Sequence, residues 1–348
     1  MNLSKLEEIL KSEPAFRLAQ AKKAVFFDLI EKWSEATTIS KKLREILEKE
    51  VPLEIKGEAF SSGDGRTVKA RLILRDGLAI ESVLMKHTDK RNTICVSSQV
   101  GCPLGCLFCE TGKMGFKRNL TASEIVEQVL FFARYLEKSA KGERAAGGKI
   151  TNVVFMGMGE PFLNWEQVKT AIEILNDDNC FGIGARKISI STSGIIEGIE
   201  KLAEVFPQIN LAISLHAPKD ELRGELMPIN KKYPLASVLA AVDAYIEKTN
   251  RKVMFEYVMI KDTNDSEEQA RGLAKLLSKP LYMVNLIAYN PTGKFKPSSP
   301  DQIKKFKAVL EKAGIFATKR YRFGTDIEAA CGQLAGKNED SSREKGEF

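Results

Sequence analysis

The chain has 348 residues, of which 43% are hydrophobic and 28% charged, and its formal net charge is +7. This composition is typical of a soluble globular protein with a large core, and the mild basic charge permits a polyanionic partner without requiring one. Six cysteines, four of them clustered, exclude the distributed disulfide framework of a small secreted protein. No apolar run approaches the roughly 18 residues of a membrane-spanning helix, and no signal peptide is recognisable, so we expect a cytoplasmic protein.

The first 91 residues contain two different apolar periods. Helical spacing predicts a first helix from Leu3 to Leu10, a second around residues 24–30 and a third through Leu43 and Leu47. From residue 52 to 86 the period changes to two, which predicts strands over 66–74 and 78–84 joined by a turn at Asp76-Gly77. We therefore predict a small N-terminal accessory domain over 1–91, helical with a β-hairpin.

A cluster of cysteines follows this domain. Cys102, Cys106 and Cys109 have the spacing C-x3-C-x2-C, which lets one loop direct three thiolates at one inorganic centre. Iron–sulfur clusters normally take four cysteine ligands, so three thiolates without a near fourth indicate a [4Fe–4S] cluster with one iron open. That iron could bind a small molecule through an amine and a carboxylate, and S-adenosylmethionine has both groups.

Two other interpretations of these cysteines stay open. A structural zinc site needs a closed set of sulfur or imidazole ligands, which Cys95 could complete, although no C-x2-C or H-x3-H partner lies downstream. Alternatively, the three thiols pack without a metal, because free cysteine behaves as a small hydrophobic side chain.

After Asn92 the chain alternates short apolar strands with amphipathic helices. The predicted strands are 93–98, 152–157, 187–192, 210–216, 253–260, 282–289 and 315–322. The predicted helices are 122–138, 165–177, 195–205, 235–249, 266–278 and 300–313, the first opening with the capping box Thr121-Ala122-Ser123-Glu124. This alternation builds a parallel sheet, so we predict an α/β fold with a partial (β/α)6-type barrel over 92–336.

Polar and glycine-rich motifs follow five of these strands, and the active site of such a barrel lies at the carboxyl ends of its strands. The motifs are the cysteine loop, Gly157–Pro161, Ser191–Gly194, Ser214–His216 and Asn290-Pro291. We expect them to converge on one rim. Two further segments lack apolar patterning: a Gly/Ala-rich insert over 138–148, predicted to be a mobile loop, and a charged tail over 337–348, predicted to be disordered.

Six segments spread over nearly the whole chain carry a resemblance to a known family. They are Cys-Val-Ser-Ser-Gln-Val-Gly-Cys (95–102), Gly-Phe-Lys-Arg-Asn-Leu-Thr (115–121), Met-Gly-Met-Gly-Glu-Pro (156–161), Ile-Ser-Leu-His-Ala-Pro (213–218), Leu-Met-Pro-Ile-Asn (226–230) and Asp-Ile-Glu-Ala-Ala-Cys-Gly-Gln-Leu-Ala-Gly (326–336). These segments resemble the RlmN/Cfr family of radical-SAM enzymes, which methylate one adenosine of 23S ribosomal RNA. The resemblance implies a radical-SAM barrel and an RNA-binding role for residues 1–91.

The resemblance also implies roles for individual residues. Cys102, Cys106 and Cys109 would ligate the [4Fe–4S] cluster. The contacts to S-adenosylmethionine would be Gly159, Glu160, Ser191, Ser214, Leu215, His216 and Asn290. Cys331 matches the cysteine that becomes S-methylated, Cys95 the one that later forms a disulfide with it, and Glu81 a proton acceptor, although one extra residue separates Glu81 from Cys95 here. Cys180 has no counterpart and is interpreted as a packed thiol.

The chemistry that the resemblance implies explains why two extra cysteines are needed. An adenine ring carbon is not nucleophilic, whereas a thiolate is, so Cys331 would first take a methyl group from one S-adenosylmethionine. A second S-adenosylmethionine, bound at the cluster, would give a 5′-deoxyadenosyl radical that abstracts a hydrogen from this methyl group. The resulting carbon radical would add to the adenine, and attack by Cys95 on the sulfur of Cys331 would release the product, with Glu81 taking the ring proton.

The implied partners are 23S rRNA, the adenosine next to the anticodon in tRNA, an external one-electron donor and a disulfide reductant, and we expect a monomer. Five basic residues that flank the two cysteine loops are predicted to contact phosphates: Lys117, Arg118, Lys319, Arg320 and Arg322. Glu160-Pro161 favours methylation of carbon 2 (the RlmN branch), whereas Phe323 favours carbon 8 (the Cfr branch), and we predict carbon 2. A remoter alternative is a non-catalytic, zinc-type RNA-binding protein.

Overall fold

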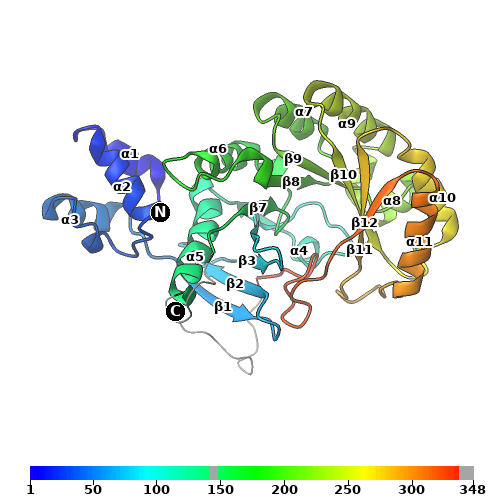
Figure 1. Cartoon of the computed structure of the whole chain (residues 1–348), viewed down its shortest axis with the longest axis horizontal. Helices are drawn as coiled ribbons and strands as arrows, with labels where there is room; N and C mark the ends of the chain where they lie inside the picture. Colours follow the sequence, from blue (N-terminus) through cyan, green and yellow to red (C-terminus); the bar gives the residue numbers. More distant parts are fainter. Residues whose placement is uncertain (141–147, 337–348) are drawn as a thin grey trace.

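The computed structural model describes residues 1–140 and 148–336. The predicted disordered tail over 337–348 and most of the predicted mobile insert, residues 141–147, lie outside the described residues. A single large sheet runs through the described part, with a group of short helices at one end and longer helices along the sheet (Figure 1).

The N-terminal helices are α1 (Leu3–Leu10), α2 (Phe16–Phe26) and α3 (Lys41–Glu50), with a 3-10 turn η1 (Trp33–Glu35) between the last two. They pack around Trp33, which is fully buried and donates its indole N–H to the carbonyl of Val51 at 2.7 Å. The predicted extent of the second helix was wrong, because α2 already ends at Phe26. Leu29 has a φ of +53°, a left-handed conformation that a right-handed helix cannot continue through.

The main sheet has ten strands in the order β1-β2-β3-β4-β7-β8-β9-β10-β11-β12. Their bounds are β1 (Lys56–Ser61), β2 (Thr67–Ile73), β3 (Ala79–Lys86), β4 (Asn92–Val96), β7 (Asn152–Phe155), β8 (Ile188–Thr192), β9 (Asn210–Ser214), β10 (Val253–Met259), β11 (Tyr282–Ala288) and β12 (Phe316–Lys319). The first four strands pair antiparallel with one another, and every pair from β4 to β12 is parallel.

The predicted hairpin forms, and its strands belong to the large sheet. Gly77 occupies the turn between β2 and β3 with a φ of +82°, a conformation that favours glycine. On its other side β3 pairs with β4, with Val83 opposite Cys95. The domain boundary predicted at residue 91 therefore falls between two hydrogen-bonded strands of one sheet.

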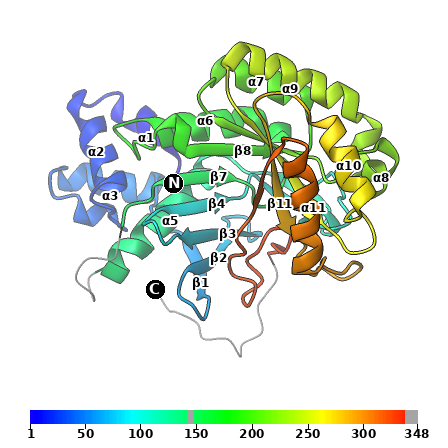
Figure 2. The same ribbon diagram turned by 45° about the vertical axis from the view of Figure 1, so that its right-hand side comes forward.

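Six long helices connect the parallel strands and lie outside the curved sheet (Figure 2). They are α5 (Ala122–Ala140), α6 (Trp165–Asn176), α7 (Ile196–Val205), α9 (Leu235–Thr249), α10 (Glu267–Leu276) and α11 (Pro300–Lys312), and each lies within two residues of its predicted bounds. The capping box that opens α5 also forms, with the Thr121 N–H donating to the Glu124 carboxylate at 2.8 Å and the Glu124 N–H to the Thr121 hydroxyl at 3.2 Å.

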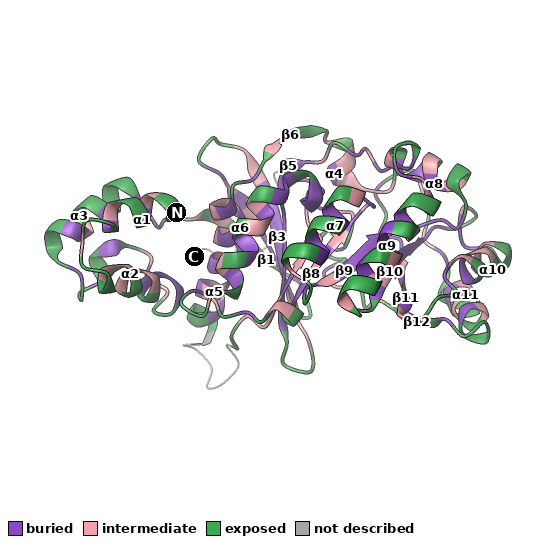
Figure 3. Cartoon of the chain, turned by 90° about the horizontal axis from the view of Figure 1, so that it is seen from above, coloured by how far each residue is buried: buried purple, intermediate pink, exposed green. Residues whose placement is uncertain are grey.

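The core lies between these helices and the sheet. Figure 3 shows the central strands of the main sheet mostly buried and the long helices buried on one side only. In α11 the buried positions are Ile303, Phe306 and Leu310, which share one helical face. The burial of one face along each helix holds the helices against the sheet and fixes where each parallel strand ends.

Several short elements have no counterpart in the sequence predictions. They are β5 (Gln99–Gly101), α4 (Glu110–Lys113), β6 (Phe116–Asn119), η2 (Pro161–Asn164), η3 (Ala185–Lys187), α8 (Asp220–Leu226) and η4 (Pro228–Lys231). Elements of three to seven residues are too short to show a full apolar period. Three of them, β5, α4 and β6, enclose the cysteine loop and give it its shape.

Candidate active site

The loops that follow the parallel strands meet around a cavity of about 200 Å³ at the carboxyl ends of those strands. Many of the residues predicted to be functional line it: Cys95, Cys109, Gly159, Glu160, Ser191, Ser214, His216, Asn290 and Cys331. Four others, Glu81, Cys102, Cys106 and Leu215, are not among the lining residues. The five motifs therefore converge on one rim, as predicted.

The cysteine loop, residues 102–109, is fixed at both ends by backbone contacts. Gly101, just before it, has a φ of +76°, and a Cβ atom there would lie 1.8 Å from the carbonyl oxygen of Gly115. Only glycine fits this close approach of two chain segments. Further along, the N–H of Leu107 donates to the carbonyl of Leu226 at 3.0 Å. The loop thus has a defined shape before any ligand binds.

The three thiols of the loop are withdrawn from water. Burial raises the pKa of Cys102 to about 12, and it raises the pKa values of Cys106 and Cys109 as well. Backbone N–H groups of Leu104 and Thr111 interact with the sulfurs of Cys102 and Cys109 respectively. Buried sulfurs with N–H groups directed at them suit a metal site, because a metal ionises the thiol and the N–H groups then stabilise the thiolate.

A cluster and a single metal ion need different arrangements of the three thiols. Across residues 1–140 and 148–336, no three His, Cys, Asp or Glu side chains lie close enough together to hold one metal ion. Zinc requires its ligands at about 2.3 Å from one atom, whereas each thiolate of a [4Fe–4S] cluster binds a different iron. Three cysteines of one loop could each bind a different iron of such a cluster.

The carboxylate of Glu160 is buried at the start of η2 and is held by backbone groups. It accepts hydrogen bonds from the N–H of Ser193 at 2.8 Å and from the N–H of Phe162 at 3.2 Å. Burial raises the pKa of Glu160, and these bonds oppose the shift. The preceding residue, Gly159, has a φ of +96° and packs against Gln99, whose side chain accepts the Glu160 N–H at 2.9 Å.

Arg223 is a buried residue that the sequence reasoning missed. Its guanidinium donates to the carbonyl of Ser193 at 2.7 Å, to the carbonyl of Ser214 at 3.2 Å and to Oδ1 of Asn230 at 2.7 Å. Burial lowers its pKa to about 10. The contacts tie together the ends of β8 and β9, where the predicted cofactor residues lie. A single arginine in a short helix gives no sequence signal for such a role.

His216 is buried at the end of β9 with a φ of +61°. Burial lowers its pKa to about 3, so the imidazole is neutral at physiological pH. Its Nδ1 accepts the N–H of Val258 at 3.1 Å, which leaves the ring proton on Nε2. The ring also meets Phe108 of the cysteine loop edge-on, with ring centroids 4.8 Å apart. His216 thus presents a fixed N–H donor next to this loop.

Asn290 links the end of β11 to the segment that carries Cys331. Its Nδ2 donates to the carbonyl of Cys331 at 3.0 Å. Its Oδ1 is buried and accepts no hydrogen bond from the described residues. A buried acceptor without a partner is costly unless a ligand supplies the donor. Asn290 therefore offers a polar contact to a bound cofactor.

Cys331 lies beside the cysteine loop. The carbonyl of the next residue, Gly332, accepts the N–H of Glu110 at 2.8 Å, and the hydroxyl of Thr111 donates to the carbonyl of Leu334 at 2.6 Å. These contacts seat the C-terminal segment on α4, directly after Cys109. The sequence alone did not show where Cys331 lies, because it is far along the chain from the other predicted residues. The structure places its thiol at the rim where those residues lie.

Cys331 and Cys95 face the same cavity as free thiols. Cys331 is exposed and Cys95 is buried on β4. Burial, reinforced by the electrostatic effect of Cys331, raises the pKa of Cys95 to about 12, and Arg320 opposes the shift.

Glu81 lies on β3, two positions before Val83, which lines the cavity, but is not itself among the lining residues. Its Oε2 accepts the N–H of Ala335 at 2.8 Å, and its Oε1 lies 3.6 Å from the ammonium of Lys69 in a buried ion pair. The structure thus brings Glu81 to the segment that carries Cys331, although through Ala335 rather than through the cavity itself.

Two charged residues that line the cavity form an ion pair that the sequence did not predict. Arg320 follows β12 and its guanidinium lies 3.5 Å from the carboxylate of Glu256 in β10. Glu256 also accepts a hydrogen bond from the side chain of Asn285 at 2.9 Å, and burial raises its pKa. The pKa of Arg320 is raised, mainly by the thiols of Cys331 and Cys95 and by Glu256.

The five predicted phosphate contacts divide into two groups. Arg118 is engaged by Asp76 at 2.6 Å and by Glu124 at 2.8 Å, Arg320 faces Glu256, and Arg322 donates to the carbonyl of Tyr289 at 2.7 Å. Lys117 and Lys319 are exposed. Phosphate contact stays a prediction, and these two lysines are the better candidates for it because they are exposed.

Comparisons with known proteins place this site in a family. Residues 96–274 match the model of the Radical SAM superfamily. The probable dual-specificity RNA methyltransferase RlmN of Chloroflexus aurantiacus is 44% identical, over 97% of this chain and 92% of its own length. The ribosomal RNA large subunit methyltransferase Cfr of Clostridium botulinum (strain Okra) is 42% identical, over 94% of both chains. The chain belongs to the RlmN/Cfr family of radical SAM methyltransferases.

A solved structure agrees with this assignment. The crystal structure of a radical SAM methyltransferase from Sphaerobacter thermophilus is 42% identical and matches with a TM-score of 0.91, covering 97% of this chain and 98% of that one. The predicted α/β radical-SAM barrel is thereby confirmed.

Membership in the RlmN/Cfr family also decides between the cofactors that the cysteine spacing left open. The protein is a radical SAM enzyme that uses a [4Fe–4S] cluster and S-adenosylmethionine. The zinc-type RNA-binding alternative is therefore wrong. In the part of the chain that the structure describes, no helix is long and apolar enough to cross a bilayer.

Proposed function

We propose that the protein methylates carbon 2 of one adenosine in 23S rRNA, and of the adenosine next to the anticodon in tRNA, through an S-methylcysteine intermediate. The observation that supports this most directly is the position of Cys331. The segment that carries it is hydrogen-bonded to α4 immediately after Cys109, and its thiol faces a cavity that Cys95 also lines.

Three cysteines are proposed to hold the cluster. Cys102, Cys106 and Cys109 share one loop whose backbone is fixed by Gly101 and by α4, so their sulfurs are positioned before the cluster binds. When bound, the cluster supplies the electron that cleaves S-adenosylmethionine reductively. Because the proposal assigns only these three protein ligands, a bound cluster would keep one position open for the amine and carboxylate of that molecule.

The strand ends are proposed to hold S-adenosylmethionine. Gly159, Glu160, Ser191, Ser214, His216 and Asn290 line the cavity beside Cys109, and Leu215 lies between two of them on the chain. Among these, Glu160 offers a carboxylate for an ammonium group, His216 a fixed N–H donor and Asn290 an acceptor without a protein partner. These donors and acceptors match the polar groups of an amino acid and a nucleoside.

Cys331 is proposed to carry the methyl group. Its thiolate attacks the sulfonium methyl of S-adenosylmethionine, a carbon–sulfur bond forms, and S-adenosylhomocysteine leaves. For the same carbon to bond to the adenine ring, one hydrogen atom of the S-methyl group would pass to the 5′-deoxyadenosyl group of a second S-adenosylmethionine, and the adduct would return one electron to the cluster as the ring proton leaves. Cys95, which faces the same cavity, would then attack the sulfur of Cys331: the sulfur–carbon bond breaks, a disulfide forms, and the freed carbon takes up a proton to become the methyl group of the released RNA. Glu81 is proposed to accept the ring proton, a role that requires its contact with Ala335 to open.

Two external reductants and a location follow from this chemistry. A one-electron donor must reduce the cluster, and a dithiol reductant must return Cys95 and Cys331 to free thiols after each turnover. Because such a disulfide is transient in a reducing compartment, we propose a cytoplasmic enzyme. We propose that it acts as a monomer.

Methylation of carbon 8 is the second candidate. Relatives named Cfr match at 42% identity, close to the 44% of a relative named RlmN, and Phe323 occupies a position where the RlmN branch usually has arginine. Glu160-Pro161 favours carbon 2.

Nucleoside mass spectrometry tests the proposal. The reconstituted enzyme is incubated anaerobically with a 23S rRNA fragment, S-adenosylmethionine and a reductant, and the RNA is digested. We expect 2-methyladenosine, with loss of product in the Cys106→Ala variant. Formation of 8-methyladenosine instead would select the second candidate, and unmodified RNA with an intact cluster would contradict both.

A further inference from the structure

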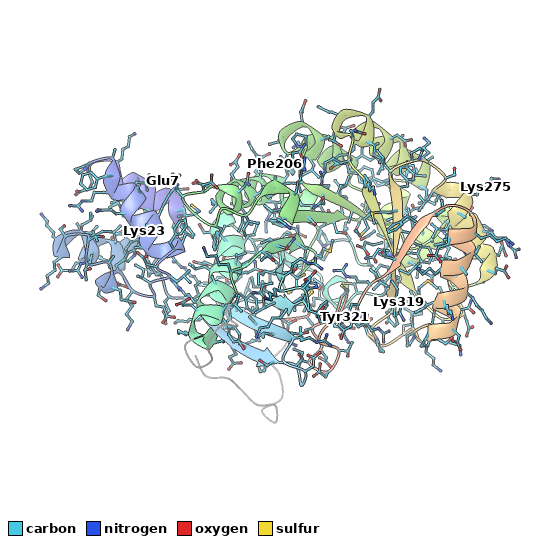
Figure 4. All side chains as sticks on the ribbon, viewed as in Figure 1. Glu7, Lys23, Phe206, Lys275, Lys319 and Tyr321 are labelled. Atoms are coloured by element: carbon cyan, nitrogen blue, oxygen red, sulfur yellow. The ribbon has the colours of Figure 1, made fainter. Side chains whose placement is uncertain are left out.

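Four side chains form a group that includes two residues of the cavity lining, Tyr321 and Phe323, and they have no role in the chemistry proposed above. They are Arg66, His87, Tyr321 and Phe323, and we call them the aromatic cluster. Tyr321 and Phe323 belong to the segment after β12, Arg66 immediately precedes β2, and His87 follows β3. Figure 4 labels Tyr321 on the segment that leaves β12 and runs towards the strands of the hairpin.

The rings of the aromatic cluster hold one another at defined angles. Tyr321 and Phe323 meet edge-to-face with centroids 4.8 Å apart, and His87 meets Phe323 in the same way at 5.0 Å. The Arg66 guanidinium lies 5.0 Å from the centroid of the Tyr321 ring and also bonds its hydroxyl. Arg66 is itself held by Asp64 at 2.8 Å. Tyr321 is therefore held in place by a cation and by an edge-to-face contact with Phe323.

The backbone under the aromatic cluster is equally constrained. Gly324 has a φ of +59°, and a Cβ atom there would meet Thr67 at 2.7 Å. Asp326 accepts the N–H of Gly63 at 2.8 Å. These contacts fasten the segment to the loop between β1 and β2, so the rings are presented by a supported chain rather than by a free loop.

Despite this support, 55% of Tyr321 remains exposed. Burial of the ring does not explain the arrangement, because more than half of its surface faces solvent. The same residue lines the cavity together with Cys331, Arg322 and Phe323. An exposed ring that is held in place, backed by a guanidinium and adjacent to the cavity suits a flat ligand that enters the cavity from outside.

Unpaired nucleobases are such ligands. Sequence-specific RNA recognition relies on bases that are splayed out and stacked on aromatic rings or on guanidinium planes. An adenine that enters the cavity must leave its stack, and its neighbour then loses a stacking partner. We propose that Tyr321 stacks on the base of a nucleotide next to the target adenosine. The proposal rests on the RNA methyltransferase function proposed above and adds a specificity-determining contact to it.

Fluorescence of a substituted RNA tests this contact. A 23S rRNA hairpin carries 2-aminopurine in place of the nucleotide on one side of the target adenosine, and a second hairpin carries it on the other side. Stacking on Tyr321 should quench one of the two probes when the reconstituted enzyme binds. We expect the quenching to persist in Tyr321→Phe, which keeps the ring, and to disappear in Tyr321→Leu.

Steady-state kinetics give the second readout. Loss of one stacked base should raise the KM for RNA about tenfold in Tyr321→Leu. Methylation of Cys331 in the absence of RNA should stay at the wild-type level, because Tyr321 acts only on the RNA. Phe316→Leu is the matched control: this phenylalanine is 63% exposed on β12 but does not line the cavity, and its loss should change neither readout.

The outcomes separate this contact from the proposed function. Quenching and a KM for RNA that are unchanged in Tyr321→Leu would overturn the stacking contact while leaving the methyltransferase intact. An equal loss in Tyr321→Phe would also overturn it, because the hydroxyl bonded to Arg66 would then be the important group. A wild-type enzyme that neither binds nor methylates the hairpins would instead overturn the proposed function on which the contact rests.

Discussion

The guanidinium of Arg320 lies 3.5 Å from the carboxylate of Glu256, within the wall of the cavity that Cys95 and Cys331 share. The pair connects β10 to the segment after β12, two parts of the sheet that are not adjacent. Glu256 is 3% exposed, so its charge depends on Arg320 and on the amide of Asn285. Arg320 in turn brings positive charge to two thiols that must react as thiolates.

Removal of this guanidinium should destabilise the protein in a pH-dependent way. Arg320→Gln leaves the buried carboxylate of Glu256 without its cation. We expect the free energy of unfolding to fall by about 2 kcal/mol. This is below the usual range for a buried ion pair because Arg320 is partly exposed. Burial raises the folded-state pKa of Glu256 above its ordinary value of 4.5. The carboxylate therefore opposes folding when ionised, and the opposition disappears as the pH falls below that ordinary value.

The stability deficit of Arg320→Gln, meaning its loss of unfolding free energy relative to wild type, should thus be largest at neutral pH and shrink as the pH is lowered towards about 5. Urea unfolding of the reconstituted proteins at several pH values measures it. Glu256→Gln in the same background removes the charge that needs compensation, so the double variant should recover stability at neutral pH. A deficit that is independent of pH would contradict the assignment of Glu256 as the affected group.

Two glycines near the cysteine loop should respond differently to alanine. Both have positive φ, +76° for Gly101 and +62° for Gly105. A Cβ atom at Gly101 would collide with the carbonyl of Gly115, whereas one at Gly105 meets nothing within 4 Å. We expect Gly101→Ala to lose most of its iron on reconstitution, and Gly105→Ala to keep it with a strain of about 1 kcal/mol. Iron content and visible absorbance check both variants, and equal iron in the two would refute the predicted difference.

The roles of Glu81 in the structure and in the chemistry can be separated. Glu81→Gln keeps an acceptor for Ala335 but removes the charge that faces Lys69, and it should lower the free energy of unfolding by about 3 kcal/mol. Adding Lys69→Met should return much of that stability. If Glu81 accepts the ring proton, the double variant stays inactive on RNA although it folds well. Recovered methylation would instead limit Glu81 to holding the C-terminal segment.

Cys95→Ala should trap RNA on the enzyme. Without the thiol that attacks Cys331, the carbon that joins sulfur to adenine has no route to release, and a covalent RNA–protein adduct should accumulate. Denaturing gel electrophoresis with labelled RNA detects it. Cys180→Ala is the matched control, because Cys180 is buried beside Asp177, outside the lining of the cavity. Normal turnover by Cys95→Ala would remove this thiol from the mechanism.

Much of the barrel could be predicted because its elements are long and periodic. Helices such as α9 (Leu235–Thr249) repeat an apolar face several times, and each buried parallel strand is bounded by polar turns. The convergence of the five motifs on one rim could be predicted because the active site of such a barrel lies at the carboxyl ends of its strands. The β3–β4 pairing was missed because alternation reveals a strand but not its neighbour, which is why the boundary at residue 91 cut the sheet.

The unpredicted parts of the site depend on contacts between distant positions. Arg223 holds the ends of β8 and β9, and Arg320 reaches back across the sheet to Glu256, yet the residues around each arginine in the sequence do not indicate these contacts. The aromatic cluster likewise joins residues 66, 87, 321 and 323. Such groups have no spacing signal, because the fold alone brings them together.

The central claim is that the thiol of Cys331 carries the methyl group on its way to RNA. Peptide mass spectrometry follows it directly, using S-adenosylmethionine with a deuterated methyl group and the reconstituted enzyme. Before RNA is added, we predict a labelled methyl group on the peptide that contains Cys331. After RNA is added, that label should leave the peptide and appear in methyladenosine. Labelled methyladenosine formed while Cys331 is never methylated would contradict the claim.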